Sequence, residues 1–565
     1  MMGDRLIIGV DYGTTYTGVA FCETSDTKFS ENLIQVIQDW PTAHTMIETK
    51  DKPHVPRHMW TKLELGVPRT GEATYIRSEV EYIQRSPVQV VADFLTRIRQ
   101  RLVKALDNRF GPALWRTIPI TLVITVPAIW SDGAKNRTLQ AFREAGFNRD
   151  LFPQLKRTIT TTEPEAAAIY TLRLMRGSVQ DDQLEVGDSF VVCDMGGGTV
   201  DLISYRISRT DPTTVEEITI GSGDQCGGSF VEREFISWLE DRLGLDHFEK
   251  IAGGPASACL YTCLPQKLAR MIQEFSMSAK SGFSGTEEYY LRLPAALSGV
   301  EDQVRGISDG ELHVDSSDMK HMFGPCLQKT RNLIADQVAK AKSSGKARLK
   351  FVFFVGGFAE SPYMFCRLKN FCASLGLQAI KPAYAWSAIV RGAAAKGLEG
   401  DGNAVLMRKC RRHYGTPCSR PFVHEIHSEA DSYISEYSGL KFATNQMQWL
   451  IKKGSDLHTS KETHAVTSLE IQFWLQEKRD VCMSLFACNQ NDAPSLLCAE
   501  NLYRVARISF NTGDIPGRFL SREYDPNDWR YFTAQALVHM SIQSAIEFSV
   551  TINGQDFGSV TVDYD

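Results

Sequence analysis

Two similar segments constrain the fold of this 565-residue chain most strongly, because each is an apolar strand that ends in an aspartate and a turn of small residues. The first is IIGVDYGTTYTGVAF, residues 7–21, and the second is FVVCDMGGGTVDLISY, residues 190–205. Each predicts a β-hairpin with glycine and threonine in its tight turn. Such turns direct backbone N–H groups toward a bound anion, and glycine allows a close approach. We therefore expect two hairpins that face one another and hold a polyphosphate, with an aspartate at each turn for Mg²⁺.

The first 400 residues alternate between short apolar strands and amphipathic helices, which is typical of an α/β architecture. A helix is predicted over 131–147, with Ser131 or Asp132 as its N-cap. The segment FVFFVGGFAESP, 351–362, predicts a buried strand, a Gly-Gly turn and the start of a helix. AWSAIVRGAAAKGL, 385–398, predicts a helix of small residues, as expected where backbones pack closely.

After residue 400 the pattern changes to short strands with alternating apolar residues and few helices, which favours a β-sandwich. Residues 469–475 and 536–542 both alternate in this way. Residues 546–552 lead into Asn553-Gly554, a strong signal for a tight turn. We expect residues 559–564 to return from this turn as the second strand of a hairpin.

Composition excludes several classes of function. The formal net charge of −5 gives no electrostatic case for binding nucleic acid or an anionic membrane. The longest apolar-biased stretch, 118–130, is too short to span a bilayer, and no apolar signal segment follows the first residues. The thirteen cysteines are scattered without a Cys-x-x-Cys pair, which favours reduced thiols. We expect a soluble protein of the cytoplasm, with the nucleus as an alternative because of the basic run RKCRR, 408–412.

Five segments, in order along the chain, are similar to motifs of the heat-shock 70 kDa chaperone family within the actin-like ATPase superfamily. They are two phosphate loops, two connecting helices and an adenosine loop: DYGTTYTG (11–18), TTEPEAAAIYTL (161–172), DMGGGTVD (194–201), GGFAESP (356–362) and AIVRGAAA (388–395). The resemblance covers nearly all of residues 5–398 and is strongest to the branch typified by heat shock 70 kDa protein 12A. It implies an α/β, actin-like ATPase fold of two lobes with duplicated ribonuclease-H-like cores, followed by a β-sandwich-like C-terminal domain.

The change of pattern places a domain boundary within residues 399–415, and the resemblance implies the domains on either side of it. The nucleotide-binding domain would cover residues 1–398, with lobe I at about 1–187 and lobe II at about 188–398. Residues 399–412 would form a linker. Residues 413–565 would form a β-rich domain that binds substrate or partner proteins and lacks the helical lid of the family.

The resemblance implies a site for ATP or ADP with Mg²⁺, carried over position by position. The residues that would cradle the phosphates are Gly13, Thr14, Thr15 and Tyr16 on one side and Gly196, Gly197, Gly198 and Thr199 on the other. Asp11 and Asp194 would hold Mg²⁺ through its water shell. Asp194, Glu163 and Asp201 would form the catalytic set that orders the metal shell and the attacking water. The remaining nucleotide contacts would come from Gly227, Gly228, Gly356 and Gly357, with Lys280 near the adenine face.

One departure from the family pattern concerns charge at the γ-phosphate. The family places a lysine there in a Gly-Asp-Ala-Ala-Lys segment, and the counterpart here, GEATY (71–75), puts Tyr75 at that position. A phenol supplies no positive charge, and the loss of one such preorganised contact typically costs roughly 100- to 1,000-fold in rate. Lys50, Lys52 and Lys62 are the alternatives that could lie at this point in space.

Two further departures concern the nucleotide loops. Glu360 stands where the chaperones commonly carry an arginine, and CGGSF (226–230) lacks the acidic pair that usually follows those glycines. We therefore expect nucleotide binding with only weak ATPase activity, ATP being converted to ADP and phosphate.

The leading hypothesis is an ATP-binding, chaperone-like protein whose lobes close around Mg-ATP and reposition the β-rich domain. Its partners would be polypeptide clients or partner proteins at that domain, together with co-chaperones, and neither nucleic acid nor an inserted membrane segment is expected. A nucleotide-binding scaffold without useful turnover is the alternative that Tyr75 favours. A small-molecule kinase shares this nucleotide core, but no aspartate is identified as its substrate-side base.

Overall fold

The computed structural model describes most of the chain as two compact units, Met1–Val405 and Leu406–Asp565, and we treat each by itself. The described residues are 5–24, 34–37, 40–41, 61–66, 86–175, 184–259, 264–399, 404–461, 463–474, 480–497, 499, 501–511, 515, 517–527, 529–542, 546–552, 554–556 and 561–564. No helix within these ranges is both long and apolar enough to cross a membrane.

The first sheet of the first unit begins with a hairpin and continues with two parallel strands. Its order is β3-β2-β1-β5-β6, with β4 paired to β2. The strands are β1 (Arg5–Tyr12), β2 (Tyr16–Thr24), β3 (Gln35–Val36), β4 (Trp40–Pro41), β5 (Ile120–Val126) and β6 (Leu155–Thr162). β1 pairs antiparallel with β2 and parallel with β5, and β5 pairs parallel with β6. Strand β5 is buried along its whole length, as expected for a parallel strand in the middle of a sheet.

The second sheet repeats this arrangement. It contains β15-β14-β7-β8-β9 in order, with β10 paired to β8. The strands are β7 (Asp188–Met195), β8 (Val200–Thr210), β9 (Thr213–Glu217), β10 (Ser222–Asp224), β14 (Arg348–Val355) and β15 (Gln378–Ile380). β7 and β8 form the antiparallel hairpin, and β14 and β15 run parallel to β7. The two hairpins expected from the similar segments are present, and the duplicated α/β fold that the family resemblance implies is confirmed.

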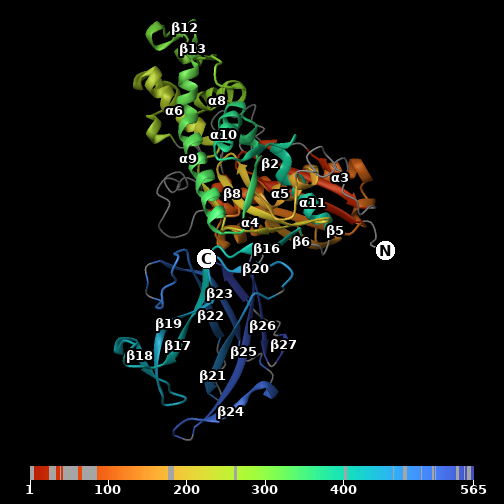
Figure 1. Ribbon diagram of the computed structural model, residues 1–565, viewed down its shortest axis with the longest axis vertical. Coiled ribbons are helices and arrows are strands. Elements are labelled where there is room, and N and C mark those ends of the chain that lie inside the picture. Colours follow the sequence, from red (N-terminus) through yellow and green to blue (C-terminus); the bar gives the residue numbers. More distant parts are fainter. Residues whose placement is uncertain are drawn as a thin grey trace. The chain divides into compact units, whose positions relative to one another are not determined.

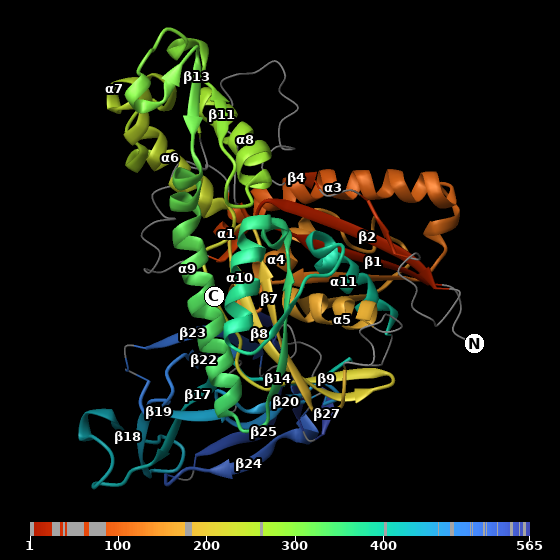
Figure 2. The same ribbon diagram turned by 45° about the horizontal axis from the view of Figure 1, so that its top comes forward.

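Helices surround both sheets and form a separate group at one end of the unit. They are α1 (Thr61–Gly66), α3 (Pro87–Phe110), α4 (Asp132–Glu144), α5 (Glu163–Met175), α6 (Ser229–Leu243), α7 (Leu245–Ala252), α8 (Gln266–Phe275), α9 (Ser316–Ser343), α10 (Pro362–Ser374) and α11 (Ala388–Leu398). The predicted N-cap of α4 is present, because Oγ of Ser131 accepts a hydrogen bond from the N–H of Ala134. In Figures 1 and 2, α6 and α8 gather with β12 (Ile307–Ser308) and β13 (Glu311–Val314) around one end of the long α9.

Small residues allow α5 and α11 to pack closely together. A Cβ on Gly392 of α11 would lie 1.8 Å from the carbonyl oxygen of Ala166 in α5. A Cβ on Gly9 of β1 would lie 2.9 Å from the backbone nitrogen of Ala394. The close backbone approach predicted for 385–398 is therefore present, and it joins α11 to both α5 and the first sheet.

The second unit is a sandwich of two antiparallel sheets. One sheet has the order β18-β19-β17-β22-β23-β28, and the other has β21-β25-β26-β27 with β24 on β25 (Figure 1). The strands are β17 (His413–Pro421), β18 (Ser432–Ile434), β19 (Lys441–Ile451), β21 (Ala465–Trp474), β22 (Asp480–Cys488), β23 (Leu502–Asn511), β24 (Ser521–Tyr524), β25 (Arg530–Ile542), β26 (Ile546–Ile552), β27 (Gln555–Asp556) and β28 (Thr561–Tyr564). Met483 and Ile508 of the first sheet share a buried core with Ile471 and Val538 of the second.

One predicted pairing in this unit is wrong. The hairpin partner of β26 is the two-residue β27, with Ile552 opposite Gln555. Residues Thr561–Tyr564, expected to return beside β26, instead pair with β23 of the other sheet. An alternating pattern specifies which face of a strand is buried but not which neighbouring strand it pairs with.

The predicted linker 399–412 contains a strand, β16 (Val405–Lys409), which pairs with β20 (Asp456–His458).

Candidate nucleotide site

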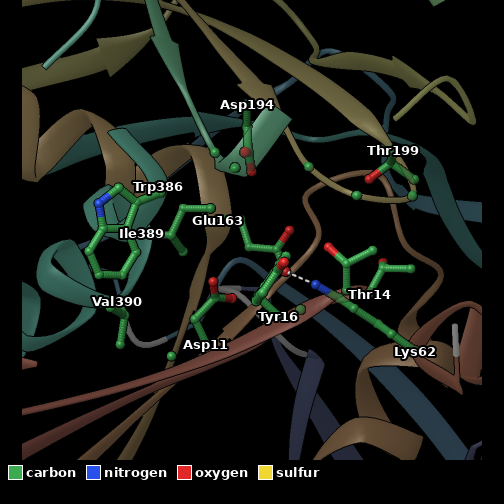
Figure 3. Close-up of a pocket in the computed structure, with 18 residues that line it drawn as sticks. Asp11, Thr14, Tyr16, Lys62, Glu163, Asp194, Thr199, Trp386, Ile389 and Val390 are labelled. Atoms are coloured by element: carbon green, nitrogen blue, oxygen red, sulfur yellow. Dashed lines mark hydrogen bonds and ion pairs between the residues drawn. The ribbon is translucent and has the colours of Figure 1, made fainter. Parts of the chain in front are cut away.

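The two hairpin loops of the first unit face one another across a cavity. One loop joins β1 to β2, and the other joins β7 to β8. A Cβ on Gly197 would lie 2.2 Å from Oγ1 of Thr15, and a Cβ on Gly198 would lie 2.9 Å from Oγ1 of Thr14. Only glycine allows the second loop to come this close to the first. Figure 3 shows Thr14 and Thr199, one from each loop, on the same side of the cavity.

Each turn is also closed tightly within itself. A Cβ on Gly13 would lie 1.9 Å from the carbonyl oxygen of Tyr16, so a larger residue does not fit. In the second turn, the N–H of Gly196 donates to the carbonyl oxygen of Thr199 at 2.9 Å. Tight turns of this kind present backbone N–H groups on a concave surface that suits anions.

The cavity has a volume of about 350 Å³, which is usual for a small-molecule site. Most of the residues expected from the sequence line it: Asp11, Gly13, Thr14, Thr15, Tyr16, Glu163, Asp194, Gly196, Gly197, Gly198, Thr199, Gly356 and Gly357. Further lining residues are Gly18, Lys62, Trp386, Ile389 and Val390. The structure thus brings together residues from both loops, from α5 and from the Gly-Gly turn after β14.

Four acidic side chains lie at or directly behind the cavity wall. Asp11 and Asp194 lie near the ends of β1 and β7, and Glu163 is the first residue of α5. Asp201 lies opposite Asp194 in the β7–β8 register, and its Oδ2 accepts a hydrogen bond from Oγ1 of Thr199 at 2.8 Å. Asp201 is buried and does not line the cavity, so it belongs to the layer behind Asp194.

Burial and mutual repulsion make these carboxylates hard to ionise together. Burial raises the pKa of Asp11, although Lys62 and the hydroxyl of Thr125, 2.6 Å away, act in the opposite direction. Burial also raises the pKa of Glu163 to about 7. The pKa of Asp194 lies well above its usual range because Asp194 is buried and close to Glu163 and Asp11, among other carboxylates.

Lys62 places a positive charge among these acids. Its Nζ lies 2.5 Å from Oε1 of Glu163, and the side chain is only 8 % exposed. Burial alone would lower the pKa of Lys62, but the carboxylates of Glu163, Asp11 and Asp194 raise it above its usual value. The ammonium therefore stays charged inside the cavity. Figure 3 shows it beside Glu163.

Hydrogen bonds hold both ends of the short helix α1, which carries Lys62. The hydroxyls of Thr61 and Tyr12 lie 2.5 Å apart, which joins the start of α1 to β1. Nε of Arg137 in α4 donates to the carbonyl oxygen of Leu65 at 3.0 Å, which holds its other end. These contacts fix the direction of Lys62.

Of the three lysines considered as substitutes for the family lysine, Lys62 lies in the site. Lys50, Lys52 and Tyr75 lie outside the described residues. The site therefore contains a buried cation, whatever the role of Tyr75.

The loop with Gly227 and Gly228 does not line the cavity but supports the second phosphate loop. The N–H of Gly227 donates to the carbonyl oxygen of Gly198 at 3.2 Å, and Oγ of Ser229 donates to that of Gly197 at 2.7 Å. Ser229, which sequence reasoning missed, replaces part of the absent acidic pair with a bond to the loop itself. These residues act by positioning the phosphate loop.

Lys280 and Glu360 also lie outside the cavity lining. Nζ of Lys280 pairs with Oε1 of Glu232 at 3.0 Å, and it lies near Gly228 rather than in the cavity. Glu360 pairs with Lys381 at 2.8 Å. Lys280, expected near the adenine face, is therefore not among the residues that line the cavity.

The Gly-Gly turn after β14 touches the acidic cluster directly. Gly356 has a φ of 88°, and a Cβ there would lie 2.6 Å from Oδ1 of Asp194. Around Gly357 no atom lies within 4 Å of where a Cβ would be, so that side of the turn is open. Both features agree with a backbone surface that lies against a ligand.

The acidic residues have the donor chemistry for a magnesium ion that keeps its waters, although the described residues contain no group of three acidic, histidine or cysteine side chains placed to bind a metal directly. Oδ1 of Asp194 is buried and has no hydrogen-bond partner among the residues described by the structure. Three carboxylates that line the cavity, Asp11, Glu163 and Asp194, share the ammonium of Lys62. Mg²⁺ prefers oxygen ligands and keeps several of its waters, so carboxylates at such an open cavity suit it.

Comparison with known proteins agrees with this geometry. A family model described as "Hsp70 protein" matches residues 49–406, and one described as "Domain of unknown function (DUF8568)" matches residues 408–499. Human "Heat shock 70 kDa protein 12A" is 24% identical over 513 residues, which cover 75% of this chain and 73% of that protein. Human "Heat shock 70 kDa protein 12B" is 22% identical over 523 residues, covering 75% and 72%.

A bacterial relative is similar over a comparable part of the chain. "Chaperone protein DnaK" of Mycoplasma mobile is 24% identical over 418 residues, which cover 72% of this chain and 60% of that protein. The Hsp70 match spans more than half of the chain and includes Lys62 and both connecting helices. The chain therefore belongs to the Hsp70 family of ATP-binding, chaperone-like proteins.

Proposed function

We propose that the first unit binds Mg-ATP and hydrolyses it slowly, and that the bound nucleotide controls how the second unit binds polypeptides. The observation that carries this proposal is the meeting of both glycine-threonine loops, the carboxylates and Lys62 around one cavity of about 350 Å³. A triphosphate needs N–H donors, a divalent cation and a fixed positive charge, and these residues supply donors, cation ligands and charge.

Each lining group has a distinct role in this proposal. The backbone of the two loops and the hydroxyls of Thr14 and Thr15 bind the phosphate oxygens, whereas the hydroxyl of Thr199 donates to Asp201. Asp11 and Asp194 hold Mg²⁺ through its water shell. Mg²⁺ neutralises part of the phosphate charge when it is bound.

Glu163 and Lys62 are the two residues that we assign to the hydrolysis step. Because the pKa of Glu163 is raised to about 7, this carboxyl group can accept or return a proton of a water near neutral pH. Lys62, oriented by Glu163 at 2.5 Å, presents its ammonium to the terminal phosphate. Behind them, the carboxylate of Asp201 accepts a hydrogen bond from the hydroxyl of Thr199 and so holds that side chain in place.

The structural contacts support slow rather than absent hydrolysis. Lys62 supplies the cation that a tyrosine at position 75 would lack, which favours measurable turnover. The departures at Glu360 and in the 226–230 segment remain, since Glu360 pairs with Lys381 and no acidic pair follows Gly228. We expect these departures to keep turnover low.

Polypeptide clients or partner proteins would bind at the second unit. Strand β18 is the last strand of its sheet, and apolar side chains near it are exposed: Ile434 by 70 %, Leu440 by 63 % and Ile426 by 76 %. Extended polypeptides add to such strand edges through main-chain hydrogen bonds, with side chains in neighbouring apolar positions.

The described cysteines are free, which supports the expected cytoplasmic location.

Binding and phosphate release should be measured on the full chain, on Asp194→Asn and on Asp188→Asn as the matched control. Asp188 is a buried aspartate at the other end of β7 that pairs with Lys350 at 2.8 Å. Wild type and Asp188→Asn should bind Mg-ATP and release phosphate, whereas Asp194→Asn should lose Mg-dependent binding and turnover. Binding with equal background turnover in all three proteins would indicate the nucleotide-binding scaffold instead. No binding by wild type would refute the proposal.

A further inference from the structure

The cavity has one apolar end, formed around an exposed tryptophan. Trp386 lies just before α11 and lines the cavity with Ile389 and Val390 of that helix. Its side chain is 38 % exposed, although large apolar side chains inside a protein are normally buried. Figure 3 shows these three residues on one side of the cavity and Lys62 on the opposite side, with Asp11 and Glu163 between them.

The turn that carries Trp386 is held in place by its neighbours. The N–H of Gly356 donates to the carbonyl oxygen of Ala385 at 2.9 Å, which joins the turn to the Gly-Gly loop. Nε of Arg391 donates to Oγ of Ser387 at 3.0 Å, and the Arg391 guanidinium lies 4.8 Å from the ring centroid of Tyr384. The indole is thus presented from a braced turn.

Trp386 itself takes no part in this bracing. Within the described part of the chain, its indole makes no hydrogen bond and no ring contact. An aromatic ring that is carried on a braced turn, exposed in a cavity and not packed on another ring is a platform on which a planar group can stack.

The arrangement of the cavity determines which planar group this would be. A nucleotide whose phosphates lie between the two glycine-threonine loops, next to Lys62, extends its base toward the opposite, apolar end. The described side chains at that end are Trp386, Ile389 and Val390, and the adjoining loop consists of Gly356 and Gly357. The indole N–H is the only polar side-chain group of these five residues, so their side chains offer little with which to read the edge of a base.

Resting on the proposed function, we infer that Trp386 stacks on the nucleobase and makes the site selective for purines without distinguishing adenine strongly from guanine. Stacking is stronger for the larger purine ring system and tolerates either purine, because both present a π-face. Strong discrimination between bases requires buried hydrogen-bonding groups that the wrong base leaves unpaired.

The test compares Mg-ATP, Mg-GTP, Mg-CTP and magnesium tripolyphosphate as ligands of the full chain by calorimetry. The variants are Trp386→Ala, the conservative Trp386→Phe, and Trp529→Ala as a control, since Trp529 is an exposed tryptophan of the second unit. Trp386→Ala should weaken ATP and GTP binding by roughly 5- to 150-fold and leave tripolyphosphate binding unchanged. Trp386→Phe should retain most of the affinity, and Trp529→Ala should match wild type.

Three further readouts concern the base itself. Wild type should bind ATP and GTP within about tenfold of each other, far below the roughly 10⁴-fold discrimination of a site that reads hydrogen bonds. It should bind CTP more weakly than either purine, and Trp386→Ala should narrow that difference. ATP should also quench the intrinsic fluorescence of wild type, and Trp386→Phe should lose this quenching.

Three results would overturn the inference. Equal weakening of ATP and tripolyphosphate in Trp386→Ala would show a structural role for the indole. Retained ATP affinity in Trp386→Ala would show that the base lies elsewhere, and strong rejection of GTP by wild type would show that the base is read by polar groups. In these cases the proposed function stands, because wild type still binds ATP. If wild type binds neither ATP nor tripolyphosphate, the proposed function fails together with the inference.

Discussion

Replacing Lys62 by methionine tests the assignment of the cation in the cavity. Methionine keeps the length and apolar stem of the side chain but removes the ammonium. Lys62 is 6 % exposed, and its Nζ lies 2.5 Å from Glu163 with Asp11 and Asp194 nearby. The variant therefore takes one positive charge from a buried cluster of three carboxylates.

The size of the effect on turnover follows from the position of Lys62. A preorganised charge aimed at the reacting phosphate contributes about 2.7–4 kcal/mol to the transition state, so its loss lowers the rate roughly 100- to 1,000-fold. Stability should also fall, because removing one partner of a buried ion pair costs about 3–5 kcal/mol. Glu163 limits this cost by taking up a proton, since its pKa of about 7 rises further without the ammonium.

The assay is single-turnover hydrolysis of Mg-ATP by the full chain. The matched control is Lys396→Met, because Lys396 of α11 is also 6 % exposed and pairs with acids, Glu399 at 3.2 Å and Glu165 at 3.7 Å. Both variants should lose thermal stability. Only Lys62→Met should lose turnover, and Lys62→Arg should fall between it and wild type, because guanidinium keeps the charge but not the shape of the ammonium.

Turnover decides the outcome of this experiment. If Lys62→Met and Lys396→Met hydrolyse ATP at the wild-type rate, Lys62 does not act on the phosphate. If both lose turnover to the same extent, the effect is one of stability and the assigned role is wrong.

Four further predictions concern other parts of the account. The pKa of Glu163, raised from 4.5 to about 7, makes the native apo protein hold a proton that the unfolded chain releases, so stability falls as pH rises from 4.5 to 7. In calorimetric unfolding, Glu163→Gln should show a shallower fall over this range, and parallel curves would contradict the assignment. Gly392→Ala should destabilise the α5–α11 crossing by about 1–3 kcal/mol, whereas Gly324→Ala in α9, where the Cβ meets open space, should be neutral or slightly stabilising in the same urea titration. Ile434→Asp should weaken binding of a fluorescent unfolded polypeptide while ATP turnover is unchanged, and equal anisotropy curves would exclude β18 as the binding edge. Chelation of Mg²⁺ should weaken ATP binding in calorimetry, and an unchanged affinity would show that Asp11 and Asp194 hold no metal.

Local chemistry made the two phosphate loops predictable from the sequence. Gly13 and Gly197 lie where any Cβ would collide with a neighbouring atom. The loops therefore require glycine at these positions, and the glycines make the loops recognisable in the sequence. Asp11 and Asp194 follow from the strands that end beside these turns. The small-residue segment 385–398 was predictable for the same reason, since Gly392 meets the backbone of α5.

Residues brought in by tertiary structure alone were harder to assign. Lys62 sits on a helix of only six residues, and a single lysine there carries no pattern that distinguishes it from Lys50 or Lys52. Its role depends on the contacts of Thr61 and Leu65 with β1 and α4, which no local signal encodes. Ser229 likewise acts only through the approach of its loop to Gly197.

Trp386 was missed because a tryptophan beside a small-residue helix is usually buried in a core. Its exposure depends on the placement of the Gly356 turn and of α11 around the cavity. The pairing of Thr561–Tyr564 with β23 was missed for a similar reason, because strand alternation does not encode the choice between two sheets.

A structure of the full chain with Mg²⁺ and a non-hydrolysable ATP analogue tests the central claim most directly. The account predicts that the terminal phosphates lie between the Gly13–Thr15 and Gly196–Thr199 loops, with Lys62 at the γ-phosphate and the metal ion next to Asp11 and Asp194. An analogue bound elsewhere, or an empty cleft at saturating concentration, would contradict it.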